Sequence, residues 1–228
     1  MTKSSTTLAI VPLRKGSKGL PKKNERIFAG KPLYLHAVNQ GIKTCGQCIV
    51  STDIEEIYNK QQTTDCIVLQ RPVELAADTS TMDEVVEHII NKLSLEKEIL
   101  VLLQATSPLR RDETIKAMLE LYSQGDFDLV MSVSKTSSSV LKSGEIQGNR
   151  FLPISLPKYC FSNRQQLPDI YKPNGAIYIF SVKDFVRFGG FVMPNIGAYV
   201  MNNFESFDID NEDDFFSAEV MFATVQRK

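Results

Sequence analysis

The chain has 228 residues, of which 43% are hydrophobic and 23% charged, and its formal net charge is −1. This length fits one α/β domain with a sizeable core. The near-neutral charge gives no reason to expect nucleic-acid or membrane-surface binding. The sequence has no apolar run of about 18 residues, the length that a membrane-spanning helix needs, and its first residues lack the apolar stretch of a signal peptide. We therefore expect a cytoplasmic protein.

The cysteines are interpreted as reduced thiols. Cys45 and Cys48 form a C-x-x-C pattern, which is typical of redox and zinc sites. The sequence has no second C-x-x-C pair and no C-x-x-H, and its only histidines are His36 and His88. Both histidines fall in apolar helical stretches, so we expect them to pack within helices rather than bind a ligand. Buried free thiols are ordinary in cytosolic chains.

Residues 8–13 form an apolar run that predicts a buried first strand, and the loop that follows is rich in glycine and cations. Gly16 and Gly19 let the backbone turn tightly and approach a ligand. The basic side chains of the loop are Arg14, Lys15, Lys18, Lys22 and Lys23. Backbone N–H groups and cations at the carboxyl end of a strand favour an anion, here a nucleoside triphosphate. The alternative is a basic surface loop without a ligand. The spacings of the P-loop and of the dinucleotide fingerprint are both absent.

Strands and helices alternate along the rest of the chain. The expected strands are residues 8–13, 48–51, 66–69, 99–103, 129–133 and 176–180. The expected helices are residues 33–42, 54–60, 85–93, 112–122 and 211–226. This alternation predicts an α/β fold with a mostly parallel sheet and helices on both faces.

Polar residues follow several of these strands, at the edge where ligands bind in such sheets. Asp53 follows residues 48–51, and we favour a helix cap over a ligand contact. Asp78 is a candidate N-cap for the helix over 85–93, and it is also a candidate ligand contact. Gln104 ends the most apolar run of the chain, which predicts a central strand, and is therefore placed for ligand contact.

The pattern breaks over residues 134–173, which are irregular and contain several serines, glycines and prolines. About forty irregular residues inside a compact domain need a purpose. A disordered linker is one option, but the segment holds Phe151, Ile154, Leu156, Tyr159 and Phe161, too many apolar residues for a solvated tail. We expect a folded arm, at about 135–172, that packs on a second subunit.

Residues 206–210 alternate between polar and apolar side chains, which predicts a strand with Asp208 and Asp210 on one face. Two carboxylates beside an oxygen-rich ligand suit Mg²⁺ (or Mn²⁺). The alternative is that Asp210 caps the final helix, whose first turn is acidic.

The chain resembles a known family in five separate strings that occur in the family's order. They are R-x-G-S-K-G-x-P-x-K-N, R-P-x-E-L-A-x-D, L-L-Q-x-T-S-P-L-R, R-Q-Q-L-P and P-N-G-A-I-Y. These strings are similar to those of the cytidylyltransferases that activate nine-carbon ulosonic sugars: the N-acylneuraminate (CMP-sialic acid) synthetases, with the legionaminic and pseudaminic acid enzymes. The resemblance implies a Rossmann-like fold of the nucleotide-diphospho-sugar transferase type over residues 1–228. It also implies a homodimer whose arms complete the neighbouring active site.

The resemblance implies that CTP and the sugar acid give the CMP-sugar and pyrophosphate, by attack of the anomeric hydroxyl on the α-phosphorus. The implied catalytic residues are Arg14, Lys23, Asp208 and Asp210, of which the two aspartates hold the metal. The implied nucleotide-binding residues are Leu13, Arg14, Gly16, Ser17, Lys18, Gly19, Lys23, Asn24, Arg71 and Asp78. The implied sugar-binding residues are Gln104, Lys142, Arg164, Asn174, Tyr178 and Phe191, with Lys142 and Arg164 reaching the partner's substrate.

Two departures leave the identity of the sugar open. Lys172 stands where the family commonly has arginine before Pro-Asn-Gly, and Val192 stands where some members carry a second aromatic residue. No residue is an obvious general base, and Asp208 or a metal-bound water are both candidates. The alternatives are an eight-carbon ulosonic acid enzyme, a glycosyltransferase that uses the D-x-D string, or a nucleotide-binding protein without catalysis.

Overall fold

The computed structural model describes residues 6–59 and 63–226. Two expectations fall partly on other residues: the lack of a signal peptide in residues 1–5, and Lys60 as the end of a short helix, both of which lie outside the described residues. Within the described part, seven strands form one sheet in the order β11-β7-β10-β6-β1-β4-β5. They are β1 (Thr7–Pro12), β4 (Cys48–Thr52), β5 (Cys66–Gln70), β6 (Ile99–Leu103), β7 (Leu129–Thr136), β10 (Ile170–Ser181) and β11 (Ile196–Val200).

The sheet is mostly parallel, as the sequence predicts. β1 pairs in parallel with β4 and β6, β4 with β5, and β7 with β11, whereas β10 runs antiparallel to both β6 and β7. The helices are α1 (Leu33–Cys45), α2 (Glu55–Tyr58), α3 (Met82–Leu93), α4 (Asp112–Gln124), α5 (Val182–Phe188) and α6 (Glu212–Gln226). None of the helices in the described residues is long and apolar enough to cross a membrane.

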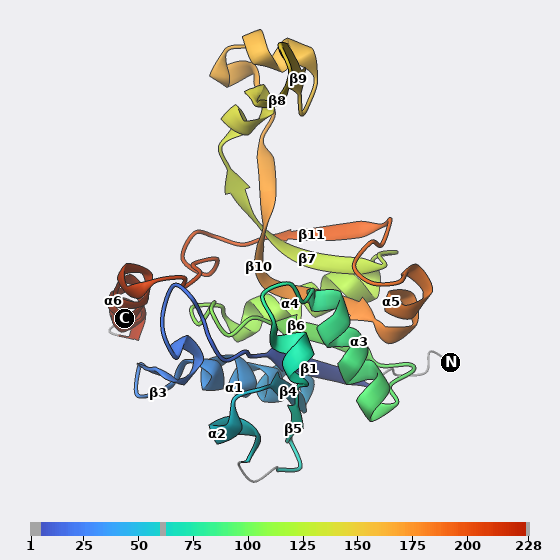
Figure 1. The fold of residues 1–228 in the computed structure, drawn as a ribbon, viewed down its shortest axis with the longest axis vertical. Helices are drawn as coiled ribbons and strands as arrows, with labels where there is room; N and C mark the ends of the chain where they lie inside the picture. The colour runs from blue at the N-terminus through green and yellow to red at the C-terminus, as the bar shows by residue number, and fades with distance from the viewer. Residues whose placement is uncertain (1–5, 60–62, 227–228) are drawn as a thin grey trace.

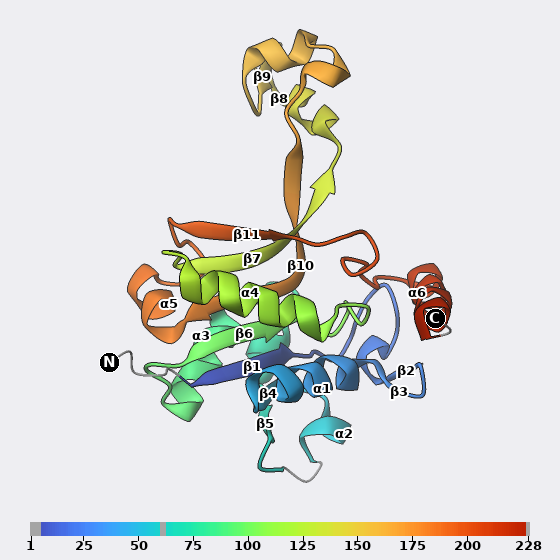
Figure 2. The ribbon, with the colours of Figure 1, turned by 180° about the vertical axis from the view of Figure 1, so that it is seen from behind.

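Helices cover both faces of the sheet because the central strands are apolar on both sides. Ala9 and Val11 of β1 belong to a core cluster with residues of α1 and α4, and Leu8 and Ile10 belong to a second cluster with residues of α3 and α5. Figure 1 shows α3 and α5 on the near side of the sheet, and Figure 2 shows α1 and α4 on the opposite side. This arrangement exposes the strand ends, where the polar residues lie.

The irregular segment after β7 is folded and projects away from the sheet (Figure 1). β7 and β10 continue past the sheet as a two-stranded ribbon, in which Thr136 pairs with Ile170. Beyond it lie a hairpin of β8 (Gly144–Gln147) and β9 (Arg150–Pro153) and three 3-10 turns, η3 (Ser138–Lys142), η4 (Pro157–Phe161) and η5 (Arg164–Gln166). We call residues 135–172 the arm.

The expected strand over residues 206–210 is wrong, and β11 was not expected. β11 is the edge strand of the sheet beside β7, whereas residues 206–210 follow a turn and form no strand. Ile209 is fully buried in a separate cluster that contains Leu20, Phe28 and Phe215. Phe207 is partly buried against the same cluster, so the packing of these two apolar residues produced the polar–apolar alternation without strand pairing.

Candidate active site

A pocket of about 300 Å³ lies at the carboxyl ends of β1 and β6. Its walls come from the glycine loop after β1, the residues that follow β5 and β6, and the segment before α6. The lining residues are Pro12, Leu13, Arg14, Ser17, Lys18, Gly19, Lys23, Asn24, Arg71, Met82, Gln104, Ala105, Thr106 and Asp210. We call this the glycine-loop pocket. The structure therefore brings together residues that the sequence places up to about two hundred positions apart.

The glycine loop packs directly against the segment that carries the aspartates. Gly16 has a φ of +81°, a conformation that L side chains rarely adopt. A Cβ atom built on Gly19 would lie 2.3 Å from the carbonyl oxygen of Asp210, so no larger residue fits there without movement. The glycines thus serve two different needs, a turn at Gly16 and a close backbone approach at Gly19.

Lys23 is a buried cation of the pocket. It begins the 3-10 turn η1 (Lys23–Glu25), and only 9% of the residue is exposed. Its Nζ donates to the carbonyl oxygen of Ile209 at 2.6 Å and lies 3.4 Å from Oδ1 of Asp210. Asn24 donates from its side chain to the carbonyl oxygen of Arg14 at 3.3 Å, which joins the two ends of the loop.

Asp78 pairs with two cations of the glycine loop. Its carboxylate lies 2.6 Å from Nζ of Lys18 and 2.5 Å from Nη1 of Arg14. The pKa of Asp78 is held below its usual range, mainly by the hydrogen bond from Lys18 and next by the hydrogen bond from Arg14. The prediction that Asp78 caps the next helix is wrong, because Thr81 caps α3 in a capping box with Glu84.

Asp53 anchors the glycine loop from the other side. Its Oδ1 accepts a hydrogen bond from the backbone N–H of Lys15 at 2.7 Å. The favoured role as a helix cap is wrong, since Ile54 occupies the N-cap of α2 and no side chain caps that helix. Instead, the N–H of Ile54 is bound by Oγ1 of Thr52 at 3.1 Å. Asp53 thus fixes the conformation of a loop to which the sequence did not connect it.

Arg71 brings a buried cation to the far wall of the pocket. Its Nε donates to Oγ of Ser51 at 3.2 Å, and its Nη2 donates to the carbonyl oxygen of Ser51 at 2.8 Å. Only 5% of the residue is exposed, and burial lowers the pKa of the guanidinium to about 10. Arg71 therefore remains charged at neutral pH.

Asp208 and Asp210 differ in their surroundings. Asp208 is half-buried near Ser107, whose Oγ donates to its Oδ1 at 3.5 Å. Burial, with the nearby charge of Asp210 adding to it, raises the pKa of Asp208. Asp210 is exposed and lines the pocket. The alternative that Asp210 caps α6 is wrong, because the side chain of Asn211 accepts from the N–H of Asp214 at 2.9 Å.

The two aspartates are a suitable donor pair for a divalent cation. Within residues 6–59 and 63–226, no group of three or more His, Cys, Asp or Glu side chains could hold a metal ion. A hard cation accepts fewer protein ligands when a phosphate supplies the others. Asp208 and Asp210 are separated by one residue, and the charge of Asp210 contributes to the raised pKa of Asp208, which agrees with two neighbouring carboxylates. The residues therefore fit Mg²⁺ bound together with a phosphate ligand.

Gln104 lines the pocket, and a buried arginine holds its backbone. Nη1 of Arg110 donates to the carbonyl oxygens of Gln104 at 3.2 Å and Ala176 at 2.7 Å. Arg110 is 2% exposed, and burial lowers its pKa to about 9. Sequence patterns predict no role for this residue beyond its place in a family string. Its contacts join the end of β6 to β10, where further candidate residues lie.

Three candidate sugar-binding residues lie on or beside β10 and do not line the glycine-loop pocket. Oδ1 of Asn174 accepts from Oγ of Ser132 at 2.6 Å and from the N–H of Ala176 at 3.1 Å. Tyr178 packs against Phe191, with ring centroids 5.7 Å apart. Asn174 is therefore engaged within the sheet, and the two aromatic residues form part of an apolar cluster.

Lys142 and Arg164 lie on the arm, in η3 and η5, away from the sheet and its pocket (Figures 1 and 2). The chain does not bring them to its own glycine-loop pocket. Gly16 also lies outside the lining of that pocket, although it belongs to the loop that forms the wall. The other proposed triphosphate contacts of the loop line the pocket directly.

Residues 8–151 match the cytidylyltransferase family model. A CMP-N,N'-diacetyllegionaminic acid synthase from Legionella pneumophila is 34% identical over 93% of this chain and 94% of its own length. An N-acylneuraminate cytidylyltransferase from Streptococcus agalactiae serotype III is also 34% identical, over 91% of this chain, which spans about half (51%) of that relative.

Solved structures share the fold at low sequence identity. A CMP:2-keto-3-deoxy-manno-octonic acid synthetase complexed with CTP has a TM-score of 0.69 at 15% identity, covering 97% of this chain and 100% of the other. A 4-diphosphocytidyl-2C-methyl-D-erythritol synthase has a TM-score of 0.62 at 8% identity, covering 96% of this chain and 100% of the other. The match over residues 8–151 and the 34% identity along nearly the whole Legionella relative establish that the chain belongs to the cytidylyltransferase family.

Proposed function

We propose that this protein transfers the cytidylyl group of CTP to a nine-carbon ulosonic acid of the sialic acid type, giving the CMP-sugar and pyrophosphate. The observation that carries the proposal is the glycine-loop pocket, in which Lys23, the glycine loop and Asp210 meet at the carboxyl edge of the sheet. The similarity to the Legionella and Streptococcus enzymes, whose names specify such sugar acids, supports the choice of substrates.

Arg14, Lys18 and Lys23 bind the triphosphate, together with the backbone N–H groups of residues 16–19. In the structure, Asp78 forms ion pairs with Arg14 and Lys18. A triphosphate carries more negative charge than one carboxylate, so it competes with Asp78 for both partners. Asp78 then holds the two cationic side chains in place until the nucleotide arrives. Arg71 and Asn24 complete the nucleotide side of the pocket.

The reaction forms a bond between the anomeric oxygen of the sugar and the α-phosphorus of CTP, and breaks the bond from that phosphorus to the pyrophosphate oxygen. The anomeric hydroxyl loses its proton, and a water molecule in the pocket is a suitable acceptor because both aspartates are assigned to the metal. Negative charge spreads over the phosphoryl oxygens in the transition state, so positioning and charge neutralisation dominate catalysis. Lys23 supplies fixed positive charge beside the site.

Asp208 and Asp210 would hold Mg²⁺ (or Mn²⁺). When bound there, the ion would supply charge neutralisation at the phosphate oxygens. Asp210 faces the pocket while Lys23 holds the backbone beside it, so the carboxylate is presented towards the nucleotide. Ser107 donates to Asp208 and fixes the second carboxylate.

The sugar acid is bound by Gln104, Asn174, Tyr178 and Phe191 of one subunit, and Lys142 and Arg164 of the other pair with its carboxylate. Exposed apolar side chains on the arm support a homodimer with shared active sites. They are Ile146, Phe151, Ile154, Leu156 and Phe161, of which Phe161 is 91% exposed. Such a cluster is rare on the surface of a monomer. A cytoplasmic location agrees with the four free thiols.

The test is pyrophosphate release with CTP and Mg²⁺ against a panel of sialic, legionaminic and pseudaminic acids, with an eight-carbon ulosonic acid as the competing substrate. Release with one of the nine-carbon acids supports the proposal and identifies the sugar. Release with the eight-carbon acid alone would reassign the substrate. If CTP binds but no acid gives pyrophosphate, the protein is a nucleotide-binding protein with another acceptor or with none.

A further inference from the structure

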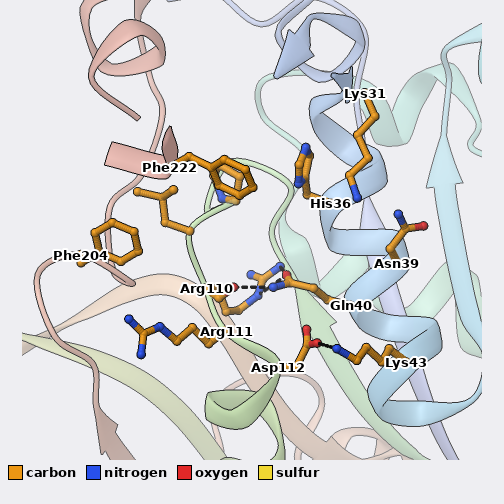
Figure 3. Close-up of a pocket in the computed structure, with 12 residues that line it drawn as sticks. Lys31, His36, Asn39, Gln40, Lys43, Arg110, Arg111, Asp112, Phe204 and Phe222 are labelled. Atoms are coloured by element: carbon orange, nitrogen blue, oxygen red, sulfur yellow. Dashed lines mark hydrogen bonds and ion pairs between the residues drawn. The ribbon is translucent and has the colours of Figure 1, made fainter. Parts of the chain in front are cut away.

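A second pocket, of about 310 Å³, lies between α1, residues 108–112 and α6 (Figure 3). We call it the α1–α6 pocket. It shares no lining residue with the glycine-loop pocket, but the two are connected by one segment: residues 104–106 line the first and residues 108–112 line the second. No step of the proposed reaction uses this second pocket.

One side of the α1–α6 pocket is apolar. Phe222 of α6 and Phe204 stand on the side opposite α1 (Figure 3), and Pro108 and Leu109 also line the pocket. The ring of Phe222 is 5.8 Å from the ring of His36, at an interplanar angle of 81°. These side chains offer a surface for an apolar or planar group.

The other side offers hydrogen-bond donors. Lys31 and Asn39 line the pocket from the α1 side, and within the described residues neither side chain has a hydrogen bond or an ion pair. His36 lies between them and the apolar side. Its Nε2 is 2.9 Å from the carbonyl oxygen of Phe28, so this nitrogen donates and the other is left as an acceptor.

The charge of the lining favours an anion. Four cationic side chains line the pocket, Lys31, Lys43, Arg110 and Arg111, against one carboxylate, Asp112. Asp112 is paired with Lys43, and Arg111 lies 3.4 Å from Glu205, which stands outside the lining. After both carboxylates are counted, two positive charges remain, and the ammonium group of Lys31 is the one that has no partner among the described residues.

From this arrangement we infer that the α1–α6 pocket binds a compact organic anion. Its carboxylate or phosphate head lies at Lys31 and Asn39, and its apolar or planar body lies against Phe204 and Phe222. The volume of about 310 Å³ lies at the lower end of the usual range for small-ligand sites, which suits a compact molecule. Charge complementarity selects an anion over a neutral or cationic molecule.

The occupant is coupled to the active site through a chain of hydrogen bonds. Gln40 lines the pocket, and its Oε1 accepts from Nε and Nη2 of Arg110 at 3.2 and 3.1 Å. Arg110 in turn donates to the carbonyl oxygens of Gln104 and Ala176. A ligand that displaces Gln40 therefore alters the support of Gln104, the proposed sugar contact. This coupling, unlike the binding itself, rests on the proposed function.

The test uses the full chain and three probes: inorganic phosphate, phenyl phosphate and benzoate. Calorimetric titrations are run with and without saturating CTP, which blocks the glycine-loop pocket, and backbone amide shifts locate the probe. The variants are Lys31→Glu and Asn39→Ala, and the matched control is Lys183→Glu, at an exposed lysine of α5. Thermal unfolding checks that each variant is folded.

We expect phenyl phosphate or benzoate to bind in the presence of CTP, to bind better than inorganic phosphate, and to lose about tenfold in affinity in Lys31→Glu but not in Lys183→Glu. The stronger of the two aromatic probes identifies the head group. Absence of binding with CTP present, or equal binding by Lys31→Glu, overturns the site. If Lys31→Glu does not fold, the affinity of Asn39→Ala for the probe is compared with that of the control in the same way.

For the coupling, we expect the bound probe to change the KM for the sugar acid by at least about twofold, with little change in kcat, and to have no effect on Lys31→Glu. Binding without a change in KM overturns the coupling. A protein that binds the probe but releases no pyrophosphate with any sugar acid would contradict the proposed function and leave the anion site standing, so the two failures are distinguishable.

Discussion

The Nζ atom of Lys23 donates a hydrogen bond to the carbonyl oxygen of Ile209 at 2.6 Å, across a separation of 186 residues. This contact joins the glycine loop at the beginning of the chain to the segment that carries both aspartates. Because Gly19 also packs against the carbonyl of Asp210, two backbone contacts fix the loop and the aspartates as one unit. The glycine loop would bind phosphate and the aspartates would bind the metal ion. The two contacts therefore hold these groups at a fixed separation before any ligand binds.

Lys23 should contribute both to catalysis and to stability. Lys23→Met should lower kcat by about 10²–10³-fold, because it removes a preorganised cation from the developing phosphoryl charge. It should also lower the melting temperature, since the carbonyl of Ile209 loses its buried donor. The measurements are pyrophosphate release and thermal unfolding. Lys22→Met, at the exposed neighbour, is the control and should change kcat little. Equal kcat values in the two variants would remove Lys23 from the catalytic residues.

Asp210→Asn tests the metal pair. It should abolish turnover with every sugar acid at ordinary Mg²⁺ concentrations while the melting temperature stays unchanged, because Asp210 is exposed and does not cap α6. The control is Asp213→Asn, an exposed aspartate in the first turn of α6, which should keep its activity. Activity of Asp210→Asn at ordinary Mg²⁺ would reject the assignment of this carboxylate to the metal.

Glu205 should hold in place the segment that carries Asp208 and Asp210. It is 6% exposed, and its carboxylate accepts from Oγ1 of Thr114 and from Nδ2 of Asn202, the latter at 3.2 Å. Glu205→Ala leaves these donors unpaired and should lower the free energy of unfolding by about 3 kcal/mol. Chemical denaturation measures the effect, with the exposed Glu113→Ala as the control. A loss no larger than that of the control would show that the contacts of Glu205 contribute little.

Stability should also depend on pH through His36. Burial lowers the pKa of His36, so the unfolded chain binds a proton at a higher pH than the folded chain does. The contribution of His36 is therefore present above its ordinary pKa and is lost as the pH falls below it. Thermal unfolding from pH 7.5 to 5 should show a smaller loss for His36→Gln than for the wild type. The non-titrating control Asn39→Gln should follow the wild type, and a wild-type slope in His36→Gln would contradict the prediction.

The central strands could be predicted from the sequence because strands buried on both faces appear as apolar runs. β6 (Ile99–Leu103) is such a run, and it lies in the middle of the sheet. β11 (Ile196–Val200) was missed because it is an edge strand in which only Gly197 is buried. Residues 206–210 were wrongly assigned because the burial of Ile209 mimicked a strand pattern. Alternation of polar and apolar residues indicates which side chains are buried, but a strand also needs a partner strand with which to pair.

The strand-end residues of the site could be predicted for a simple geometric reason: the carboxyl ends of parallel strands meet at one edge. Contacts that depend on which loops approach each other could not. Asp53 was assigned to the helix that follows it, whereas the structure gives it to the glycine loop. Arg110 received no role, because its partners Gln104 and Ala176 come together only when β10 inserts beside β6.

The last prediction tests the shared active site. If Arg164 of one subunit completes the pocket that contains Arg14 of the other, Arg14→Ala and Arg164→Ala should each be inactive alone. In a mixed dimer one site carries both changes and the other carries neither, so random mixing should restore on the order of a quarter of the wild-type activity. The measurement is pyrophosphate release after subunit exchange, with differently tagged chains to verify that mixed dimers form.

No restoration in verified mixed dimers would mean that Arg164 serves its own subunit, and would require the arm to fold back from the position seen in Figure 1. Phe161 and Ile146 are exposed on that arm, and a second subunit would supply a surface that covers them. These exposed apolar side chains therefore favour restoration of activity in the mixed dimer.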